Sequence, residues 1–304
     1  MKQPVKLYPA FQDYLWGGTN LKSVYPACDK TPIAEAWVLS CHPDGTSTLM
    51  GEPTTLAEYV AQNPDCVGKK GAKFPFFPIL IKLIDAQQSL SVQVHPDDAY
   101  AMEKENSFGK TEMWYVLDCK EGAALYYGFE QDITKEEFAA RIENNTLTEV
   151  LHAVPVKKGD VFFIPAGTIH AIGAGMLIAE IQQNSNTTYR VYDYGRVGAD
   201  GKPRALHIDK ALDVTDLCPA PAYKNEDPDV LADCDYFRVK RLTAATKGLV
   251  GKDSFVSLLV VDGSATLTYD GGEVELNQYD CLFMPADLGE YTLRGDFEIL
   301  EVGV

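Results

Sequence analysis

The distribution of apolar and polar residues along the chain predicts a protein built mainly from β-strands. Residues 33–50 and 76–94 are rich in β-branched and aromatic residues and are interrupted by proline, aspartate and glycine, which is typical of strands joined by turns. After Gly109 the pattern continues, and it predicts further strands at residues 113–117, 124–127, 160–165 and 177–183. We therefore expect a mainly-β fold.

Helical signals are few and short. Residues 54–62 start at a threonine and continue with apolar residues at helical spacing. Residues 134–142 begin with a capping box, in which Thr134 reaches Glu137 ahead of an apolar stretch. Residues 97–106 complete a set of three short predicted helices.

The strand pattern divides into two units. Residues 213–235 contain several prolines and many acidic residues and show little periodicity. We expect this segment to connect an N-terminal unit, residues 1–212, to a C-terminal unit, residues 236–304. The C-terminal unit is nearly all strand and turn, and Asp-Gly-Gly at residues 270–272 predicts a hairpin.

A weak internal repeat relates the two units. Residues 158–170 align with residues 278–290, so that Pro165 falls on Pro285. Two related β-barrel halves explain this similarity most economically. Only the first half keeps a histidine, His170, at the end of the repeated segment.

Composition and charge exclude several classes of protein. The 304 residues include 27 Lys and Arg against 44 Asp and Glu, a net charge of −17, which argues against nucleic acid as a partner. No apolar run approaches the roughly 20 residues that cross a bilayer, so we expect no membrane partner and a cytoplasmic location. The seven scattered cysteines lack a CxxC pair and fit neither a disulfide framework nor a thiolate zinc site.

A turn at the end of the first repeat positions a histidine. The pattern is Gly159-x5-Pro165-x-Gly167-x2-His170, in which glycine permits tight turns and proline stiffens the exit of a strand. The imidazole is then held at one angle near the mouth of a barrel. The segment resembles the second motif of the cupin superfamily, and the competing interpretation is an ordinary β-turn with a surface histidine.

Four polar side chains of the first unit form a candidate metal site. Gln93 and His95 lie two positions apart on a predicted strand, so both project to one face. Glu112 stands at the start of another strand. With His170 these residues give a mixed nitrogen and oxygen set that suits zinc or a similar divalent ion. A hydrogen-bonded core histidine would explain His95 taken alone.

The chain resembles the type I mannose-6-phosphate isomerases, in the order and spacing of the shorter bacterial form. The segments that carry the resemblance are FPILIKLIDAQQSLSVQVHPDD, GKTEMWYVL, GDVFFIPAGTIHAI and QQNSNTTYRVYDYGR. The resemblance implies two cupin-like jelly-roll units, the second degenerate and without metal, and the zinc-dependent interconversion of mannose 6-phosphate and fructose 6-phosphate. By motif it implies one Zn²⁺ per chain with the ligands Gln93, His95, Glu112 and His170.

The resemblance implies roles for two cations, and the charge of the chain suggests roles for two more. Arg190 matches the active-site arginine of the family, and we expect it to stabilise charge on an enediolate; Lys110 matches a lysine at the pocket. We assign Lys82, Lys110 and Arg196 to substrate oxygens or phosphate, because a protein of charge −17 needs local cations to bind a phosphorylated sugar. The competing interpretation of each is an ordinary surface charge.

Two departures from the longer family members leave the proton-shuttling residue open. Those members carry a histidine just before the pocket lysine, where this chain has Gly109. They also carry an acid four residues before the arginine, where this chain has Asn186. The helical domain of the long form is missing as well, which predicts a smaller and more open cleft.

Two other functions compete with the isomerase. A metal-dependent dioxygenase would keep the fold, but iron oxygenases favour histidine-rich shells and an amide ligand argues for a redox-inert ion. A non-catalytic sugar-binding or regulatory cupin would bind its ligand without turnover, and chelation distinguishes it from the isomerase. The sequence carries no signal for the oligomeric state.

Overall fold

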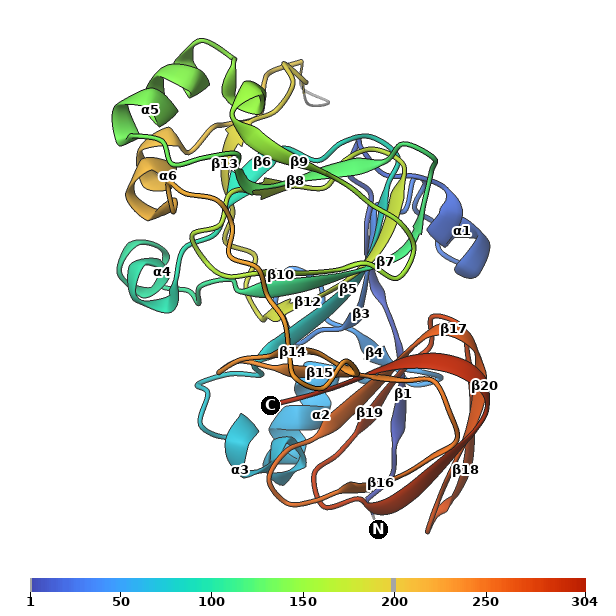
Figure 1. The fold of residues 1–304 in the computed structure, drawn as a ribbon. Helices are drawn as coiled ribbons and strands as arrows, with labels where there is room; N and C mark the ends of the chain where they lie inside the picture. Colours follow the sequence, from blue (N-terminus) through green and yellow to red (C-terminus); the bar gives the residue numbers. More distant parts are fainter. Residues whose placement is uncertain (1, 198–200) are drawn as a thin grey trace. The chain divides into compact units, whose positions relative to one another are not determined.

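Strands dominate the computed structural model, which describes residues 2–197 and 201–304 (Figure 1). The predicted mainly-β class with few helices is confirmed. None of the helices in the described ranges is long and apolar enough to cross a bilayer.

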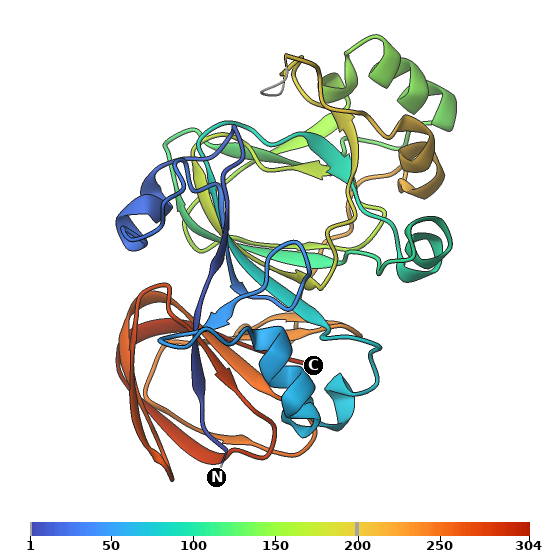
Figure 2. The same ribbon diagram turned by 180° about the vertical axis from the view of Figure 1, so that it is seen from behind.

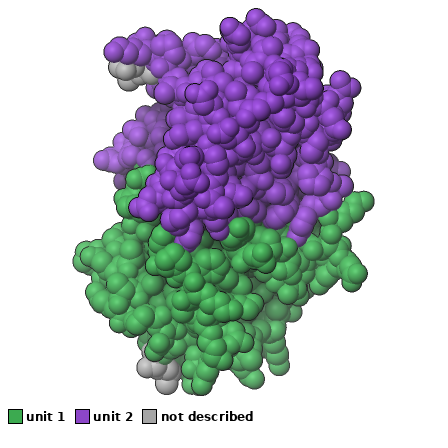
Figure 3. Space-filling model, turned by 90° about the vertical axis from the view of Figure 1, so that its left-hand side faces the viewer, with its two compact units in different colours: residues 1–11, 36–82, 224–304 green, residues 12–35, 83–223 purple. Residues whose placement is uncertain are grey.

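The chain forms two compact units, which Figure 3 distinguishes by colour. Unit 1 combines residues 1–11, 36–82 and 224–304, and unit 2 combines residues 12–35 and 83–223. These units differ from the linear boundaries expected from the sequence, because two N-terminal stretches group with the C-terminal residues. The cause is long-range strand pairing, which local patterns do not reveal.

Unit 1 contains a nine-stranded antiparallel sheet. Its strands are β1 (Val5–Tyr8), β4 (Thr48–Leu49), β14 (Val230–Asp233), β15 (Arg238–Leu242), β16 (Thr246–Val250), β17 (Val256–Tyr269), β18 (Gly272–Asn277), β19 (Cys281–Met284) and β20 (Gly289–Gly303). The order is β14-β15-β20-β17-β19-β1-β4, with β16 on β20 and β18 on β17. Tyr269 pairs with Gly272 across a two-residue turn, which confirms the predicted hairpin.

The core of unit 1 is apolar. Leu258 and Val260 of β17, Leu282 of β19 and Leu293 of β20 belong to one buried cluster. The helices of this unit are α2 (Leu56–Gln62), η1 (Pro64–Val67) and α3 (Gly68–Gly71), which lie close together (Figure 2). Thr55 and Glu58 form a capping box at the start of α2, as the threonine there predicts.

Unit 2 contains strands of two sheets that face each other (Figure 1). One sheet has the order β13-β6-β11-β8-β9, and the other has the order β10-β7-β12-β5-β3-β2. The bounds are β5 (Ile79–Ala86), β6 (Val92–Val94), β7 (Glu112–Cys119), β8 (Ala124–Phe129), β9 (Leu151–Pro155), β10 (Val161–Ile164), β11 (His170–Ala171), β12 (Met176–Gln183) and β13 (Tyr189–Tyr192). The chain passes from one unit to the other within β2 (Ala10–Gln12), β3 (Glu35–Leu39) and β5.

The helices of unit 2 are α1 (Asn20–Val24), α4 (Asp98–Glu105), α5 (Lys135–Glu143), η2 (Leu147–Glu149) and α6 (Ile208–Val214). Thr134 accepts a hydrogen bond from the backbone N–H of Glu137, which confirms the cap predicted for α5. The start of α4 is confirmed as well, because Asp97 accepts from the N–H of Tyr100. The sequence analysis missed α1, α3 and α6, which are short.

Strand alternation in the five-stranded sheet separates an apolar face from a polar one. Val92 and Val94 of β6 pack in one cluster with Phe138 of α5 and Ala211 of α6. Gln93, between the two valines, therefore projects from the opposite face. Helices α5 and α6 thus fix the outer face of the sheet, and the polar residues face the second sheet.

Candidate metal centre

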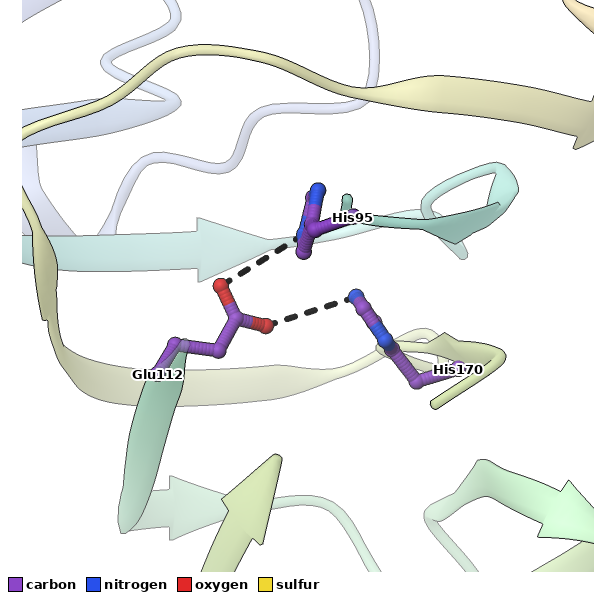
Figure 4. A group of neighbouring side chains, drawn as sticks. All are labelled: His95, Glu112 and His170. Carbon is purple, nitrogen blue, oxygen red and sulfur yellow. Dashed lines mark ion pairs between the residues drawn. The ribbon is translucent and has the colours of Figure 1, made fainter. Parts of the chain in front are cut away.

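Both sheets of unit 2 contribute to one cluster of metal-binding side chains. His95 follows β6, His170 begins β11, and Glu112 begins β7 on the opposite sheet. Figure 4 shows the carboxylate of Glu112 pointing between the two imidazoles. The three side chains are at most 1% exposed.

Strand register places further polar residues in the same row. Arg190 on β13 lies directly opposite Gln93, and Gln93 lies directly opposite His170. His170 is in turn opposite Tyr127 of β8. Residues directly opposite each other in an antiparallel pair project to one face, so this row lines the inner face of the sheet. Gln93 and Arg190 are partly exposed, whereas His170 is fully buried.

Backbone carbonyls orient both imidazole rings. The Nδ1 atom of His95 is 2.9 Å from the carbonyl oxygen of Thr187, and Nδ1 of His170 is 2.8 Å from that of Thr168. A carbonyl only accepts, so each ring carries its proton on Nδ1 and donates it there. The lone pair on each Nε2 atom therefore points toward Glu112. Metal-binding histidines are commonly oriented in this way, by a hydrogen bond from the ring nitrogen that does not bind the metal.

Three electron-pair donors converge in a small space. Nε2 of His95 is 3.6 Å from one carboxylate oxygen of Glu112, and Nε2 of His170 is 3.3 Å from the other. One ligand atom from each residue lies within 4.8 Å of the others. Burial, together with the charge of Lys110, lowers the pKa of His170 to about 3, so its ring stays neutral at pH 7. Neutral lone pairs facing a carboxylate repel one another unless a cation lies between them, and the donor set therefore fits a divalent ion.

The fourth predicted ligand, Gln93, lies beside this group. Its side-chain Nε2 is 3.4 Å from Nε2 of His170, within hydrogen-bonding range of the ring's lone pair. The structure thus brings together Gln93, His95, Glu112 and His170, the complete set expected from the sequence. Whether the amide of Gln93 ligates directly stays a prediction.

Lys110 supplies a positive charge against the donor set. Its ammonium group is 3.2 Å from Nε2 of His95 and hydrogen-bonds to Glu112. Glu180 of β12 lies on its other side, 3.6 Å away, and accepts a 3.0 Å hydrogen bond from the indole N–H of Trp114. The sequence analysis missed Glu180 and Trp114, although both stand on strands whose alternation could have placed them inside.

Arg190 is held by polar contacts next to the row. Its Nε donates to the hydroxyl of Ser91 at 3.2 Å, and one terminal nitrogen donates to the carbonyl of Ala205 at 3.1 Å. Burial and the charge of Arg204 lower the pKa of its guanidinium, but an arginine keeps its charge in a protein. The side chain is therefore a fixed cation at the rim of the inner face.

Arg196 belongs to a partly buried ion-pair network that the sequence did not predict. Arg196 and Arg204 both donate to the carboxylate of Asp193, at 2.5 and 2.6 Å. Burial works against this carboxylate, but the two arginines hold its pKa below the usual range. Arg196 also donates to the carbonyl of Ser89 at 2.6 Å. Two guanidinium groups share one carboxylate, so the network keeps net positive charge.

Lys82 is placed by a different contact. It lies on β5, is 4% exposed, and its ammonium nitrogen is 5.0 Å from the centre of the Trp37 ring. Such a geometry is a cation–π contact, which explains how an apolar strand tolerates a lysine. Its assignment to the substrate stays a prediction.

Gly109 has a structural reason to lack a side chain. A Cβ atom there would lie 2.5 Å from the backbone carbon of Asp97 and 2.6 Å from the backbone nitrogen of Asp98. The N–H of Gly109 donates to the carboxylate of Asp98 at 2.8 Å. No other residue fits, so Gly109 cannot contribute a proton-shuttling group, and Asn186 lies exposed outside the buried row.

Comparison with known families matches two parts of the chain. Residues 5–123 match phosphomannose isomerase type I, catalytic domain, and residues 229–304 match mannose-6-phosphate isomerase, cupin domain. The first match contains Gln93, His95 and Glu112. His170 lies between the two matched ranges.

Full-length relatives carry the same description. A probable mannose-6-phosphate isomerase of Bacillus subtilis, GmuF, is 39% identical over 99% of both chains. A mannose-6-phosphate isomerase of Streptococcus mutans is 36% identical over 99% of this chain and 98% of its own. The crystal structure of mannose 6-phosphate isomerase from Bacillus subtilis matches with a TM-score of 0.91 and 32% identity, and all of both chains is covered.

Proposed function

We propose, because the chain belongs to the type I mannose-6-phosphate isomerase family, that it interconverts mannose 6-phosphate and fructose 6-phosphate. The observation that carries the proposal is the convergence of His95, Glu112 and His170 on one buried point, where their ligand atoms lie close enough together to hold a metal ion. The relatives named above are described as isomerases of this type, and the site lies where the family motifs fall in this chain.

Zinc is the ion that we propose for this site, one per chain. Imidazole nitrogen and carboxylate oxygen are both zinc ligands, and Gln93, His95, Glu112 and His170 would hold the ion. When bound, it supplies a Lewis acid that stabilises negative charge on sugar oxygens. Backbone carbonyls already hold both imidazole rings in the orientation that metal ligation needs, which supports a site that is preorganised before the ion binds.

The residues beside the site suit an aldose–ketose conversion. Such a reaction moves a proton between adjacent carbons through an enediol or enediolate, and negative charge develops on the oxygens. Arg190 lies opposite Gln93 and supplies a fixed positive charge at the rim. Lys110 supplies a second one, buried between Glu112 and Glu180. We assign catalytic roles to both cations.

The phosphate of the substrate requires cations in a protein of net charge −17. We assign Arg196 to this task. Its side chain is fixed by Asp193 and Ser89, so little conformational freedom is lost when an anion binds.

The seven free thiols agree with our expectation of a reducing, cytoplasmic location.

We further propose that both units are cupin-like jelly rolls and that only unit 2 holds a metal. Support comes from the repeat, since the segments after Gly159 and Tyr279 adopt the same backbone turn. Glu290 stands where unit 2 has His170, and Glu290 is exposed.

A coupled assay that measures fructose 6-phosphate from mannose 6-phosphate tests the function. We expect turnover that EDTA abolishes and zinc restores, and far slower turnover of unphosphorylated mannose. A sugar-binding protein without catalysis would instead bind mannose 6-phosphate unchanged after chelation. Absence of turnover in the zinc-loaded protein would overturn the isomerase proposal.

A further inference from the structure

Among the described residues of unit 2, the buried amides of Gln182 and Asn184 each have an oxygen that receives no hydrogen bond, and Gln182 is the one paired with Glu112. Gln182 of β12 is 0% exposed. Its amide nitrogen donates to two backbone carbonyls, those of Gln183 at 2.8 Å and Ser185 at 2.6 Å. Its Oε1 atom, by contrast, receives no hydrogen bond within the described ranges.

The orientation of this amide is fixed by chemistry. Carbonyl oxygens only accept, so the nitrogen of Gln182 must face both of them and a flipped amide would lose both bonds. The Oε1 atom therefore points away from the backbone of its own strand. Its direction does not depend on a choice between two alternative placements of the side chain.

Strand register places Gln182 beside the metal centre. Gln182 lies directly opposite Glu112 in the antiparallel pair of β12 and β7. Directly opposite side chains share one face and stand about 5 Å apart at Cβ. Because the carboxylate of Glu112 faces His95 and His170, Gln182 projects from the same inner face.

The neighbouring glutamine shows what a purely structural role looks like. Gln183 is also buried, but its Oε1 accepts from the N–H of Thr111 at 2.8 Å and its Nε2 donates to Asp98 at 2.9 Å. Both ends of that amide are used. A buried acceptor left without a donor costs free energy, so the difference between the two amides points to a donor that arrives from outside the chain.

We propose that Gln182 binds substrate, and that its Oε1 accepts a hydrogen bond from a hydroxyl group of the sugar. This inference rests on the proposed function. A hydroxyl suits the site because it donates one proton without charge, whereas a phosphate presents only acceptors to an acceptor. Gln182 therefore recognises the polyol part of the substrate, beside the metal centre to which Glu112 belongs.

The test uses polyols that cannot isomerise. Binding of mannitol 6-phosphate to the zinc-loaded protein is measured by calorimetry, and it is compared with binding of analogues that each lack one hydroxyl. In the wild type, we expect one deoxy analogue to bind roughly tenfold more weakly than the full polyol. In Gln182→Met, which removes the acceptor at similar volume, we expect the full polyol and that analogue to bind equally.

Two controls separate recognition from damage to the fold. Gln183→Met removes the partnered neighbour, and it should leave the ratio between the full polyol and the deoxy analogue at its wild-type value. Gln182→Asn keeps the amide but withdraws the oxygen by one methylene, and it should lose the ratio as Gln182→Met does. It replaces Gln182→Met if that variant does not fold, and zinc content and circular dichroism verify each protein.

The inference is overturned if the hydroxyl ratio survives in folded, zinc-loaded Gln182 variants, because a bound water would then satisfy Oε1. It is also overturned if the wild type binds none of the polyols or binds all of them equally. Binding without turnover in the coupled assay would reject the isomerase and leave the role of Gln182 in recognition intact.

Discussion

Unit 2 and unit 1 contain a strand and turn of the same backbone conformation, 120 positions apart, but with different side chains. Strand β10 spans Val161–Ile164 and β19 spans Cys281–Met284. Before each strand the chain turns at a residue of positive φ, +89° at Gly159 and +69° at Tyr279. After each strand it does so again, at Gly167 with +91° and Asp287 with +65°. The weak repeat seen in the sequence is therefore a repeat of backbone conformation.

The residues that end the two turns separate their functions. His170 is fully buried and faces Glu112, whereas Glu290 is exposed. The cluster of unit 1 around Val260 and Leu282 is apolar throughout. The turn is therefore a scaffold. Its chemistry depends on which residue stands at its end and on which side chains that residue faces.

Replacing His170 and Glu290, the residues that end the two turns, by alanine tests the comparison most strongly. We expect His170→Ala to lose zinc and to lower kcat/KM at least ~10³-fold, since the ion's electrostatic contribution amounts to several kcal/mol. Glu290→Ala, the matched change in unit 1, should keep both at wild-type values. Metal analysis and the coupled assay measure the two quantities. Full zinc content in His170→Ala, or two ions per wild-type chain, would contradict the assignment.

Arg190 tests whether the row opposite His170 acts in the reaction. We expect Arg190→Ala to lower kcat about a hundredfold, about 3 kcal/mol, with a smaller change in KM, because the interaction strengthens as charge develops on the sugar. Arg190→Lys should recover little, since an ammonium lacks the planar pair of donors that reaches Ser91 and Ala205. A rise in KM with unchanged kcat would make Arg190 a phosphate anchor instead.

Much of the fold was readable from local pattern, and the remainder depends on distant pairing. The three predicted helices and the hairpin at residues 270–272 carry capping and turn residues that act within a few positions. The division into units was not readable, because β1 pairs with β19 across most of the chain. Short helices such as α1 and α6 lack side-chain caps, so they give no local signal.

The site was predictable where spacing alone fixes direction. Gln93 and His95 share a face by strand alternation, and the turn before His170 is encoded by glycine and proline. Glu180 and Gln182 escaped notice because their role depends on the register of β12 against β7. The network of Asp193 with Arg196 and Arg204 joins residues that are close in sequence, but it depends on a backbone conformation outside helices and strands that spacing does not reveal.

The turns before and after β10, at Gly159 and Gly167, differ in how they tolerate a side chain. In Gly167→Ala the new Cβ would lie 2.7 Å from the carboxylate of Asp216 at a φ of +91°, so we expect unfolding to become easier by roughly 2 kcal/mol. Gly159→Ala has only Tyr115 near, at 3.8 Å, and should lose about 1 kcal/mol from backbone strain alone. Asp287→Gly relieves that strain in unit 1 but gives the unfolded chain more conformational freedom, so we expect the free energy of unfolding to change little. Urea denaturation measures all three, and equal losses at Gly159 and Gly167 would contradict the role of Asp216.

An effect that is absent at neutral pH and emerges only on acidification concerns stability, and it arises from the burial of His170 in unit 2. Burial, aided by the charge of Lys110, lowers its pKa from 6.5 to about 3 in the folded protein. Between these values the unfolded chain binds a proton that the folded chain does not. The free energy of unfolding of the metal-free protein should therefore fall as the pH drops through this window, by up to about 1.4 kcal/mol per pH unit from this residue.

A variant without the imidazole isolates this contribution. We expect metal-free His170→Gln to show a shallower loss of stability between pH 6.5 and about 3 than the wild type, and the same dependence above pH 6.5, where neither state takes up the proton. Urea denaturation at a series of pH values gives the slopes. Equal slopes for wild type and His170→Gln would mean that folding does not lower the pKa of this imidazole, and they would contradict the lowered pKa attributed to its burial.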